Sequence, residues 1–317
     1  MTLVARLSTL LIVILLAGCS QEKVQVIEGS IYGTTYSVKF TENINKEEIH
    51  TLVKAELDRI DMVFSTYKED SMITRFNHRD ESCITEESFG NCLSEEFLDL
   101  LWLSDEINIK SEGAFNPFLN MMPPNEWGFI KGEGDYFSEY NPMFFYFDWY
   151  DPDNNNPYLL NDVLLLDFSA VGKGYAVDRI SALLFENGIS NYFIDIGGEV
   201  SINGTKFEEF WTWGINNPFD LNIDAYRAFN APQSGISIAT SGEYRNPGHI
   251  WGEGPKDGIS VTVIHDTTTH ADAWATAMYV LGIDKGLKIA EKEGLAVFFI
   301  KNDGKTVNSS EWSKIYP

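Results

Sequence analysis

Two oxygen-bearing side chains, Asp272 and Thr276, are four residues apart in the apolar segment 271–282. If the segment is helical, their Cβ atoms lie about 5–6 Å apart. A carboxylate and a hydroxyl at that separation are hard oxygen ligands suited to Mg²⁺, which fills its other positions with waters and phosphates. A second hypothesis needs no metal: if Thr269 is the N-cap, Asp272 is the third helical residue, where the helix dipole favours an acid. Spacing alone favours this capping role.

A Gly-rich turn, residues 169–174 (SAVGKG), precedes a predicted helix. Backbone N–H groups at a helix N-terminus favour phosphate, so the turn is a candidate phosphate contact. It is not a P-loop, because Gly174 follows Lys173 and no Gly precedes Gly172 by five positions. Asp167, at the end of the predicted strand before the turn, is more often a turn former than a ligand.

The other candidates are single residues or short turns. Tyr67 follows the first predicted helix, where its ring can stack on a flat ligand, although most Tyr residues only pack. The turn 113–117 (GAFNP) and the isolated His249 and His270 are also more often structural, although an imidazole can transfer a proton. None of these residues identifies a site by itself.

The elements that would position these residues form a mixed pattern of strands and helices. Strands are predicted within 24–40 and at 163–168, 192–196, 211–215, 235–239, 259–264 and 296–300, and helices at 46–63, 98–109, 175–187, 271–281 and 287–293. Strict strand–helix alternation is missing, so we predict an α+β fold with mixed or antiparallel sheets and packed helices. Residues 121–161, rich in aromatic residues, Pro, Asn and Asp, predict a long surface excursion.

The first residues are typical of an export signal. Arg6 is the only charge before an apolar stretch, residues 7–16, which is too short for a membrane-spanning helix of about 20 residues. The stretch ends at Leu16-Ala17-Gly18-Cys19, which resembles a bacterial lipobox; an ordinary cleaved signal with an incidental Cys is the alternative. We expect a signal peptide at 1–18, one domain at 19–317, and a lipid anchor at Cys19 that holds the protein in the cell envelope, facing the periplasm, in the outer membrane or the outer leaflet of the inner membrane.

Charge and cysteine content bound the partners and the compartment. Without residues 1–18 the chain holds 22 Lys and Arg against 47 Asp and Glu, a formal charge of −25, which excludes nucleic acid as a partner. An anionic substrate must therefore be received locally by a metal, a Lys or backbone N–H groups. Cys83 and Cys92 lie in a polar turn segment where no His completes zinc-type spacing, so they predict a local disulfide in an oxidising compartment.

In sequence order, the motifs resemble one family over nearly the whole mature chain. They are 33–36 (GTTY), 64–67 (FSTY), 113–117 (GAFNP), 125–129 (NEWGF), 167–178 (DFSAVGKGYAVD), 195–199 (DIGGE), 240–246 (TSGEYRN) and 271–282 (ADAWATAMYVLG). Together with the lipobox, this order resembles the ApbE family of FAD:protein FMN transferases. The resemblance implies a T-fold-like core and Mg²⁺-dependent transfer of FMN from FAD to a Ser or Thr of an acceptor, releasing AMP. The acceptor would be a subunit of an electron-transfer membrane complex or a periplasmic flavoprotein.

The resemblance also assigns roles to individual residues. It makes Asp272, Thr276 and the Ala170 carbonyl the Mg²⁺ ligands, and His249 the residue that assists transfer, with Asp272 as the second catalytic residue. The residues implied to contact FAD are Asp167 and Lys173 at the nucleotide, Tyr67 on the flavin, Ala114, Phe115 and Asn116 along the pocket, Tyr32 where the family usually has Met, and Trp251.

Two departures from the family pattern keep other functions open. Asn116-Pro117-Phe118 replaces Asp-Pro-Thr and loses a charge, and residues 249–253 (HIWGE) replace His-Ile-Ile-Asp-Pro. Both changes predict altered affinity or activity. One alternative is an Mg²⁺-dependent FAD pyrophosphatase, in which water replaces the acceptor hydroxyl. The other is a non-catalytic FAD-binding lipoprotein.

We predict that Cys19 is acylated and that residues 1–18 are absent from the mature protein. Each buried CH₂ of an acyl chain contributes about 0.8 kcal/mol, so two or three chains anchor the protein stably. Mass spectrometry of protein extracted from membranes should therefore find an acylated N-terminal Cys19. An intact Met1, or an unmodified Cys19, contradicts the prediction.

Overall fold

The structure is a computed structural model that describes residues 23–78, 80, 93–118, 150–151, 156–157, 165–223, 225–252 and 254–317. Cys19, Cys83, Cys92 and Glu253, the NEWGF segment and most of the predicted excursion lie outside these residues. The signal peptide, lipidation and disulfide therefore stay predictions. Within the described residues, no helix is long and apolar enough to cross a membrane.

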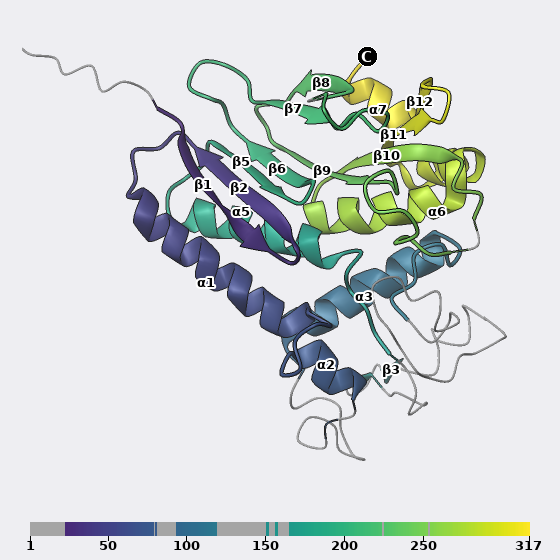
Figure 1. Cartoon of the computed structure of the whole chain (residues 1–317), viewed down its shortest axis with the longest axis horizontal. Coiled ribbons are helices and arrows are strands. Elements are labelled where there is room, and N and C mark those ends of the chain that lie inside the picture. The colour runs from purple at the N-terminus through teal and green to yellow at the C-terminus, as the bar shows by residue number, and fades with distance from the viewer. Residues whose placement is uncertain are drawn as a thin grey trace, which may run out of the picture.

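An eight-stranded sheet forms the centre of the fold (Figure 1). Its order is β1-β2-β5-β6-β9-β10-β11-β12, and each neighbouring pair is antiparallel. Two pairs, β3 with β4 and β7 with β8, stand outside it. The strands are β1 (Gln25–Ile31), β2 (Thr34–Phe40), β3 (Tyr150–Asp151), β4 (Asn156–Pro157), β5 (Tyr192–Ile196), β6 (Glu199–Asn203), β7 (Thr212–Ile215), β8 (Arg227–Asn230), β9 (Ile236–Ser241), β10 (Gly258–His265), β11 (Ala296–Lys301) and β12 (Thr306–Asn308).

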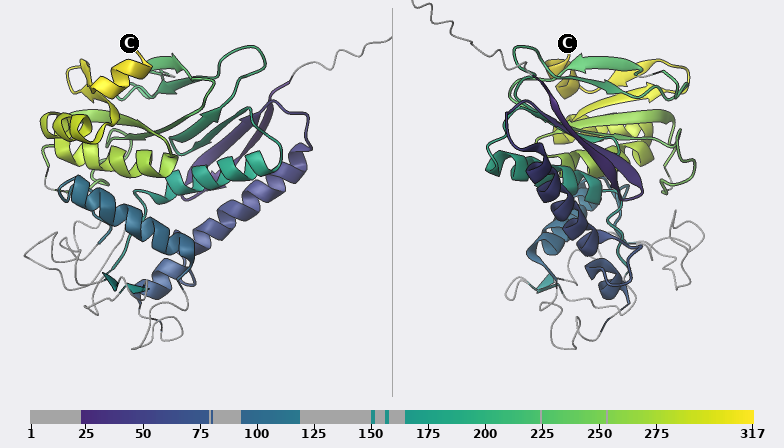
Figure 2. Two further views of the ribbon diagram at one scale, coloured as in Figure 1. Left: turned by 180° about the vertical axis from the view of Figure 1, so that it is seen from behind. Right: turned by 60° about the vertical axis from the view of Figure 1, so that its left-hand side comes forward.

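The helices pack on the sheet in layers (Figures 1 and 2). On one face, α5 and α6 lie directly against the strands, with α1 and α3 beyond them, while α7 and the β7–β8 hairpin cover the opposite face. The helices are α1 (Lys46–Phe64), α2 (Met72–Asn77), α3 (Glu95–Lys110), α5 (Gly172–Glu186), α6 (Thr268–Glu293) and α7 (Ser310–Ile315). Antiparallel strands with packed helices confirm the predicted α+β class.

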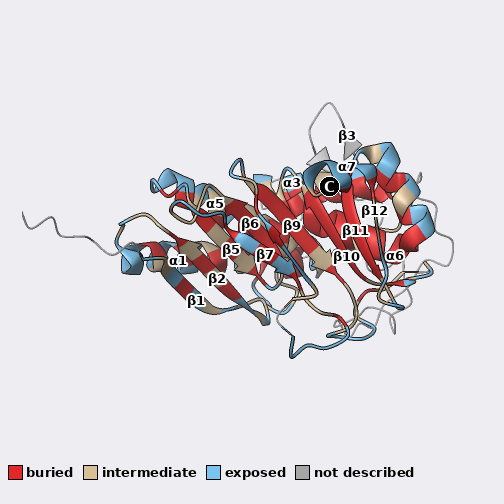
Figure 3. Ribbon diagram, turned by 90° about the horizontal axis from the view of Figure 1, so that it is seen from above, coloured by how far each residue is buried: buried red, intermediate tan, exposed pale blue. Residues whose placement is uncertain are grey.

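Alternation along the central strands builds two apolar cores, one on each face of the sheet. In β11, Val297 and Phe299 join the core beneath α5 and α6, whereas Phe298 and Ile300 join the core beneath the β7–β8 hairpin and α7. Successive side chains of a strand point to opposite faces, so a strand that is covered on both faces is apolar throughout. Figure 3 shows this as nearly continuous burial along β9, β10 and β11.

Two carboxylates link α5 and α6, because each accepts hydrogen bonds from N–H groups at the start of the other helix. The N-cap of α5 is Val171, whose side chain cannot accept a hydrogen bond, and Asp272 of α6 instead accepts from the Gly174 N–H at 2.9 Å. In return, Asp178 of α5 accepts from the N–H groups of Thr268 and Thr269, both at 2.8 Å. N–H groups in the first turn of a helix have no partner within it, so each acid satisfies donors that its neighbour leaves open.

The structure corrects the predicted helix cap. The N-cap of α6 is Thr267, whose Oγ1 accepts from the His270 N–H at 3.3 Å, and not Thr269. Asp272 therefore lies beyond the first turn of α6, so it does not cap its own helix. The capping hypothesis was therefore wrong, and Asp272 instead accepts from an N–H at the start of α5.

Other element boundaries also differ from the sequence prediction. The predicted strand at 163–168 is reduced, in its described part, to one bridge between Leu166 and Phe118, because the Asn77 side chain takes both the N–H and the carbonyl of Leu166. Helix α5 begins at Gly172 rather than at residue 175. The two helices predicted at 271–281 and 287–293 form one element, α6, interrupted at Gly282, where φ is 70°.

We predict that Gly174→Ala destabilises the protein and Gly172→Ala does not. A Cβ at Gly174 would lie 2.4 Å from the Thr268 carbonyl oxygen and 2.8 Å from the Asp272 Cβ, whereas a Cβ at Gly172 meets nothing within 4 Å. Overpacking of this kind lowers the free energy of unfolding by about 1–3 kcal/mol. Gly172→Ala, on the same helix, should leave it unchanged or raise it by up to about 1 kcal/mol. Urea denaturation decides this, and equal effects of the two substitutions would contradict the close helix contact.

Candidate active site

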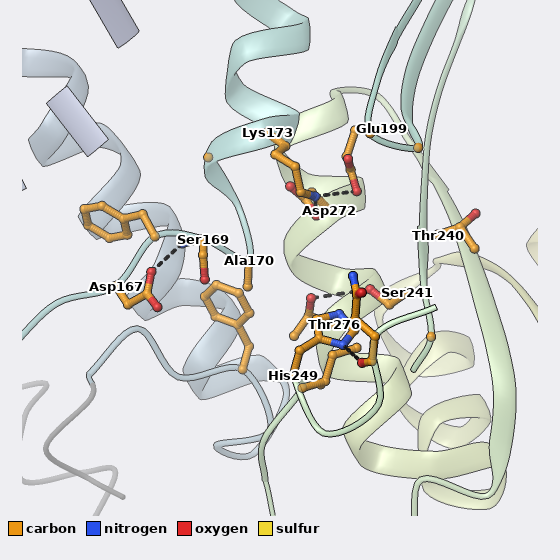
Figure 4. A pocket seen from close by; sticks show the side chains of 18 of the residues that line it. Asp167, Ser169, Ala170, Lys173, Glu199, Thr240, Ser241, His249, Asp272 and Thr276 are labelled. Atoms are coloured by element: carbon orange, nitrogen blue, oxygen red, sulfur yellow. Dashed lines mark hydrogen bonds and ion pairs between the residues drawn. The ribbon is translucent and has the colours of Figure 1, made fainter. Parts of the chain in front are cut away.

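One pocket brings together every residue predicted from sequence to bind a cofactor, bind a metal or catalyse. Its volume is about 1430 Å³, larger than the roughly 300–1,000 Å³ of a drug-sized ligand site. The predicted residues on its wall are Tyr32, Tyr67, Ala114, Phe115, Asn116, Asp167, Ala170, Lys173, His249, Trp251, Asp272 and Thr276. These residues are far apart in the sequence, and the fold brings them to one pocket (Figure 4).

The β1–β2 turn and the end of α1 form one wall of the pocket. Tyr32 and Gly33 have φ values of 53° and 72°, which close a tight hairpin, and the Tyr32 hydroxyl donates to the Leu57 carbonyl at 3.0 Å. Burial raises the pKa of Tyr32 above its ordinary value. Tyr67, in contrast, is 73% exposed, so its ring is available to a ligand.

The turn after α3 supplies a second wall. Buried Asn108 donates from Nδ2 to the Phe115 carbonyl at 2.6 Å and so fixes the turn that carries Ala114 and Asn116. The Asn116 side chain accepts from the Phe118 N–H at 2.9 Å. An Asn therefore holds this turn by local hydrogen bonding without the charge of the Asp usual in the family pattern.

Asp167 also shapes a turn and lines the pocket at the same time. Its Oδ1 accepts from the Ser169 N–H at 2.7 Å, which holds the turn that leads to Ala170 and α5 (Figure 4). Burial raises the pKa of Asp167, and the hydrogen bonds from Ser169 oppose that rise.

A half-buried lysine, Lys173, lies beside two carboxylates in the pocket (Figure 4). The Lys173 Nζ is 2.6 Å from Glu199 Oε1 and 3.7 Å from Asp272 Oδ1. Glu199 and Asp272 are each only 3% exposed. Burial opposes a charge on Lys173, but the two carboxylates raise its pKa above the ordinary value, so it is a cation. Burial raises the pKa of both carboxyl groups, and Lys173 opposes that rise.

The pocket residues fit a divalent cation of the Mg²⁺ type. Asp272 Oδ1 lies 3.7 Å from Lys173 Nζ, beyond hydrogen-bond distance. The Thr276 hydroxyl lies 3.4 Å from the Ser241 hydroxyl on the facing strand β9. Ala170, with its backbone carbonyl, lines the same pocket. Among the described residues, no group of three or more His, Cys, Asp and Glu could hold a metal. A site with one carboxylate therefore needs hydroxyl, carbonyl and phosphate oxygens, which Mg²⁺ accepts.

His249 lies on the loop between β9 and β10, opposite Lys173 in the pocket. Its Nδ1 lies 2.5 Å from the Asn246 carbonyl oxygen, which can only accept, so Nδ1 is the donor in this contact. Glu243 holds the loop on α6, because it accepts from the Ile250 N–H at 3.0 Å and from the Tyr279 hydroxyl at 3.4 Å.

The chain is similar to known proteins over most of its length. Residues 32–299, a range that includes all the predicted pocket residues, match the ApbE family. The chain belongs to the ApbE family. It is 30% identical to the FAD:protein FMN transferase of Escherichia coli (strain K12), over 94% of this chain and 93% of that protein. It is 31% identical to the enzyme of the same name from Salmonella typhimurium, over 89% and 85%.

Solved ApbE structures share the fold. The apo form of the Pseudomonas stutzeri flavinyl transferase ApbE aligns with a TM-score of 0.71 at 27% identity, over 94% of this chain and 99% of that one. The Vibrio cholerae flavin transferase ApbE aligns with a TM-score of 0.69 at 25% identity, over 92% and 99%. The ApbE-like architecture predicted from sequence is thus confirmed.

The departure of this ApbE chain after His249 has a packing explanation. Gly252 has a φ of 132°, and a Cβ at Gly254 would lie 1.5 Å from the Val280 carbonyl oxygen. The two glycines let the loop lie directly on α6, and an Asp in place of Gly252 would bring its Cβ to 2.6 Å from Val280 Cγ1. The loop still brings Trp251 to the pocket wall.

Four residues of this ApbE pocket or its supports were not singled out from sequence as site residues. Glu199 and Arg245 lay within quoted motifs, as did Ser241 and Asp178, but no role was given to them. The signal for Glu199 was an acid directly after the Gly197-Gly198 turn that follows a buried strand. Its partner, Lys173, is 26 residues earlier, so only the fold reveals the pair.

Proposed function

We propose that this ApbE-family protein is an FAD:protein FMN transferase that moves FMN from FAD to a Ser or Thr hydroxyl of an acceptor protein. One observation carries the proposal: a single pocket of dinucleotide size joins a lysine held by two carboxylates, oxygen ligands for Mg²⁺ and an imidazole. The names of the relatives supply the reaction class.

The proposed reaction exchanges one phosphorus–oxygen bond for another. The acceptor's hydroxyl oxygen bonds to the FMN-side phosphorus of FAD, and the bond from that phosphorus to the bridging oxygen breaks. AMP leaves with the bridging oxygen, and the hydroxyl proton goes to Nε2 of His249. An imidazole in reach of the acceptor hydroxyl can serve as this base.

The residues of the pocket divide the remaining work. When bound, Mg²⁺ would neutralise charge on the diphosphate, and Asp272, Thr276 and the Ala170 carbonyl would hold it. Lys173 would contact the nucleotide, and Asp167 would shape the turn beneath it. Tyr67 would pack on the flavin, with Tyr32, Ala114, Phe115, Asn116 and Trp251 forming the walls.

The same proposal places the protein at the cell envelope, anchored through Cys19 and facing the periplasm. Its acceptor would be an exported flavoprotein or a subunit of an electron-transfer membrane complex. An acidic chain of this kind repels anionic surfaces, so a lipid anchor would hold it at the membrane where charge would not.

Release of AMP distinguishes this function from its alternatives. The purified protein is incubated with FAD and Mg²⁺, with and without an acceptor carrying an exposed Ser or Thr. A transferase releases AMP in step with FMN-labelled acceptor. A pyrophosphatase releases AMP and free FMN without the acceptor, and a non-catalytic binder releases no AMP.

We predict that Asp272→Asn abolishes transfer but spares the fold. The Asn oxygen can still accept from the Gly174 N–H, so the free energy of unfolding should fall by about 1 kcal/mol or less. Loss of the metal-binding charge should lower the rate of FMN labelling by about 100-fold or more. Mg²⁺ should also no longer raise the melting temperature of the FAD complex. Labelling at near wild-type rate in low Mg²⁺ would show that Asp272 is no metal ligand.

We predict that Arg245→Gln weakens FAD binding without changing stability. The other cations of the pocket are paired, Lys68 with Asp61 at 2.6 Å, Lys285 with Glu112 at 2.8 Å and Lys173 with Glu199, whereas exposed Arg245 makes no ion pair with a described residue. A charged hydrogen bond to phosphate contributes about 1.5 kcal/mol, so the Kd for FAD should rise about tenfold.

The matched control for Arg245→Gln is Lys68→Gln, because Lys68 already forms an ion pair with Asp61. Flavin fluorescence titration should show a smaller change in Kd for this variant. Equal effects of the two substitutions would mean that general charge, rather than the unpaired state of Arg245, sets the affinity.

A further inference from the structure

We propose that Glu199 is a positioning residue that holds Lys173 away from Asp272, so that the Asp272 carboxylate stays open to a divalent cation. This inference rests on the proposed function, since it concerns the same metal site. It adds that Lys173 and the metal compete for the Asp272 carboxylate, and that Glu199 favours the metal by binding Lys173.

The distances show which carboxylate holds the lysine. The Lys173 Nζ lies 2.6 Å from Glu199 Oε1, within hydrogen-bond distance, but 3.7 Å from Asp272 Oδ1, beyond it. Asp272 uses its other oxygen, Oδ2, for the Gly174 N–H. Oδ1 is thus the oxygen of Asp272 that a metal can take, and Lys173 forms an ion pair with it at 3.7 Å without a hydrogen bond.

The backbone fixes Glu199, whereas Lys173 has a long flexible side chain. Glu199 begins β6, directly after the tight turn of Gly197 and Gly198, whose φ values are 70° and 109°. The Gly198 N–H donates to Asp195 Oδ1 at 2.9 Å, which locks this turn. The carboxylate is therefore held in place by the sheet, and the lysine is drawn to it.

The contact with Lys173 also accounts for the burial of Glu199. Its second oxygen, Oε2, is buried and has no hydrogen-bond partner among the described residues. A buried carboxylate without a cation is strongly unfavourable. If Glu199 loses its charge, Asp272 becomes the one carboxylate left beside Lys173, and the ammonium should move onto Oδ1 and exclude the metal.

The test is Glu199→Gln, which keeps the shape of the side chain and removes its charge. Mn²⁺ binding is followed by the loss of the free-ion EPR signal in the presence of saturating ADP, which supplies phosphate oxygens. We expect the Kd for Mn²⁺ to rise about tenfold. A crystal structure of the variant should show Lys173 Nζ within hydrogen-bond distance of Asp272 Oδ1. A lysine that stays where it is would overturn the proposal, whatever the Kd.

A double-mutant cycle separates competition from simple loss of charge. Lys173→Met should tighten Mn²⁺ binding by about threefold or more, and adding Glu199→Gln in that background should change it by less than about twofold, because no lysine is left to restrain. Equal effects of Glu199→Gln with and without Lys173 would overturn the proposal. If Lys173→Met does not fold, the structure of Glu199→Gln decides.

The control variant is Glu112→Gln, which removes a carboxylate of the same pocket that pairs with Lys285 instead. Its Kd for Mn²⁺ should match that of the wild type. If the wild-type protein binds no Mn²⁺, both this inference and the metal-dependent function fail. If it binds Mn²⁺ and Glu199→Gln leaves the Kd unchanged, only this inference fails.

Discussion

The exchange of carboxylates between α5 and α6 is the interaction on which the pocket depends. Asp272 accepts from an N–H at the start of α5 and Asp178 accepts from two N–H groups at the start of α6, so each helix satisfies donors of the other. Gly174 lets the two backbones meet, because any side chain there would collide with the Thr268 carbonyl. The turn before α5, the half-buried Lys173 and the candidate metal ligand Asp272 all lie at this junction. Their relative positions are therefore set by the same contacts that stabilise the fold.

A strongly acidic protein faces an electrostatic problem when its substrate is an anion. The pocket does not solve it with a basic surface: Lys68, Lys173 and Lys285 are each matched by a nearby carboxylate. The proposed divalent cation at Asp272 and the exposed Arg245 would therefore offset much of the charge of a diphosphate. Such a pocket would bind the nucleotide and the metal together better than either one alone, because each provides the charge that the other lacks.

The sequence predicted the fold class and most of the central strands, because their signals are local. The roles of the pocket residues came instead from the family resemblance, and Glu199 and Arg245, which also line the pocket, were given none. The strand 192–196 and the start of α1 at residue 46 were found from periodicity alone. What failed depends on distant partners. Leu166 does not extend a strand because Asn77, 89 positions earlier, takes its hydrogen bonds. Likewise, the pairing of Lys173 with Glu199 leaves no periodic trace, since it joins a helix start to the far end of a hairpin.

Asp272 shows why spacing could not decide between a cap and a metal ligand. Both hypotheses assumed that the residue does one thing, and that a cap must serve its own helix. In the structure its two oxygens have different partners. Oδ2 accepts from the Gly174 N–H, and Oδ1 lies 3.7 Å from Lys173 Nζ, which is too far for a hydrogen bond. One carboxylate can therefore stabilise the helix junction and remain a ligand. The structural role even assists the proposed chemical one, because the bond to Gly174 fixes the direction in which Oδ1 is presented to the pocket.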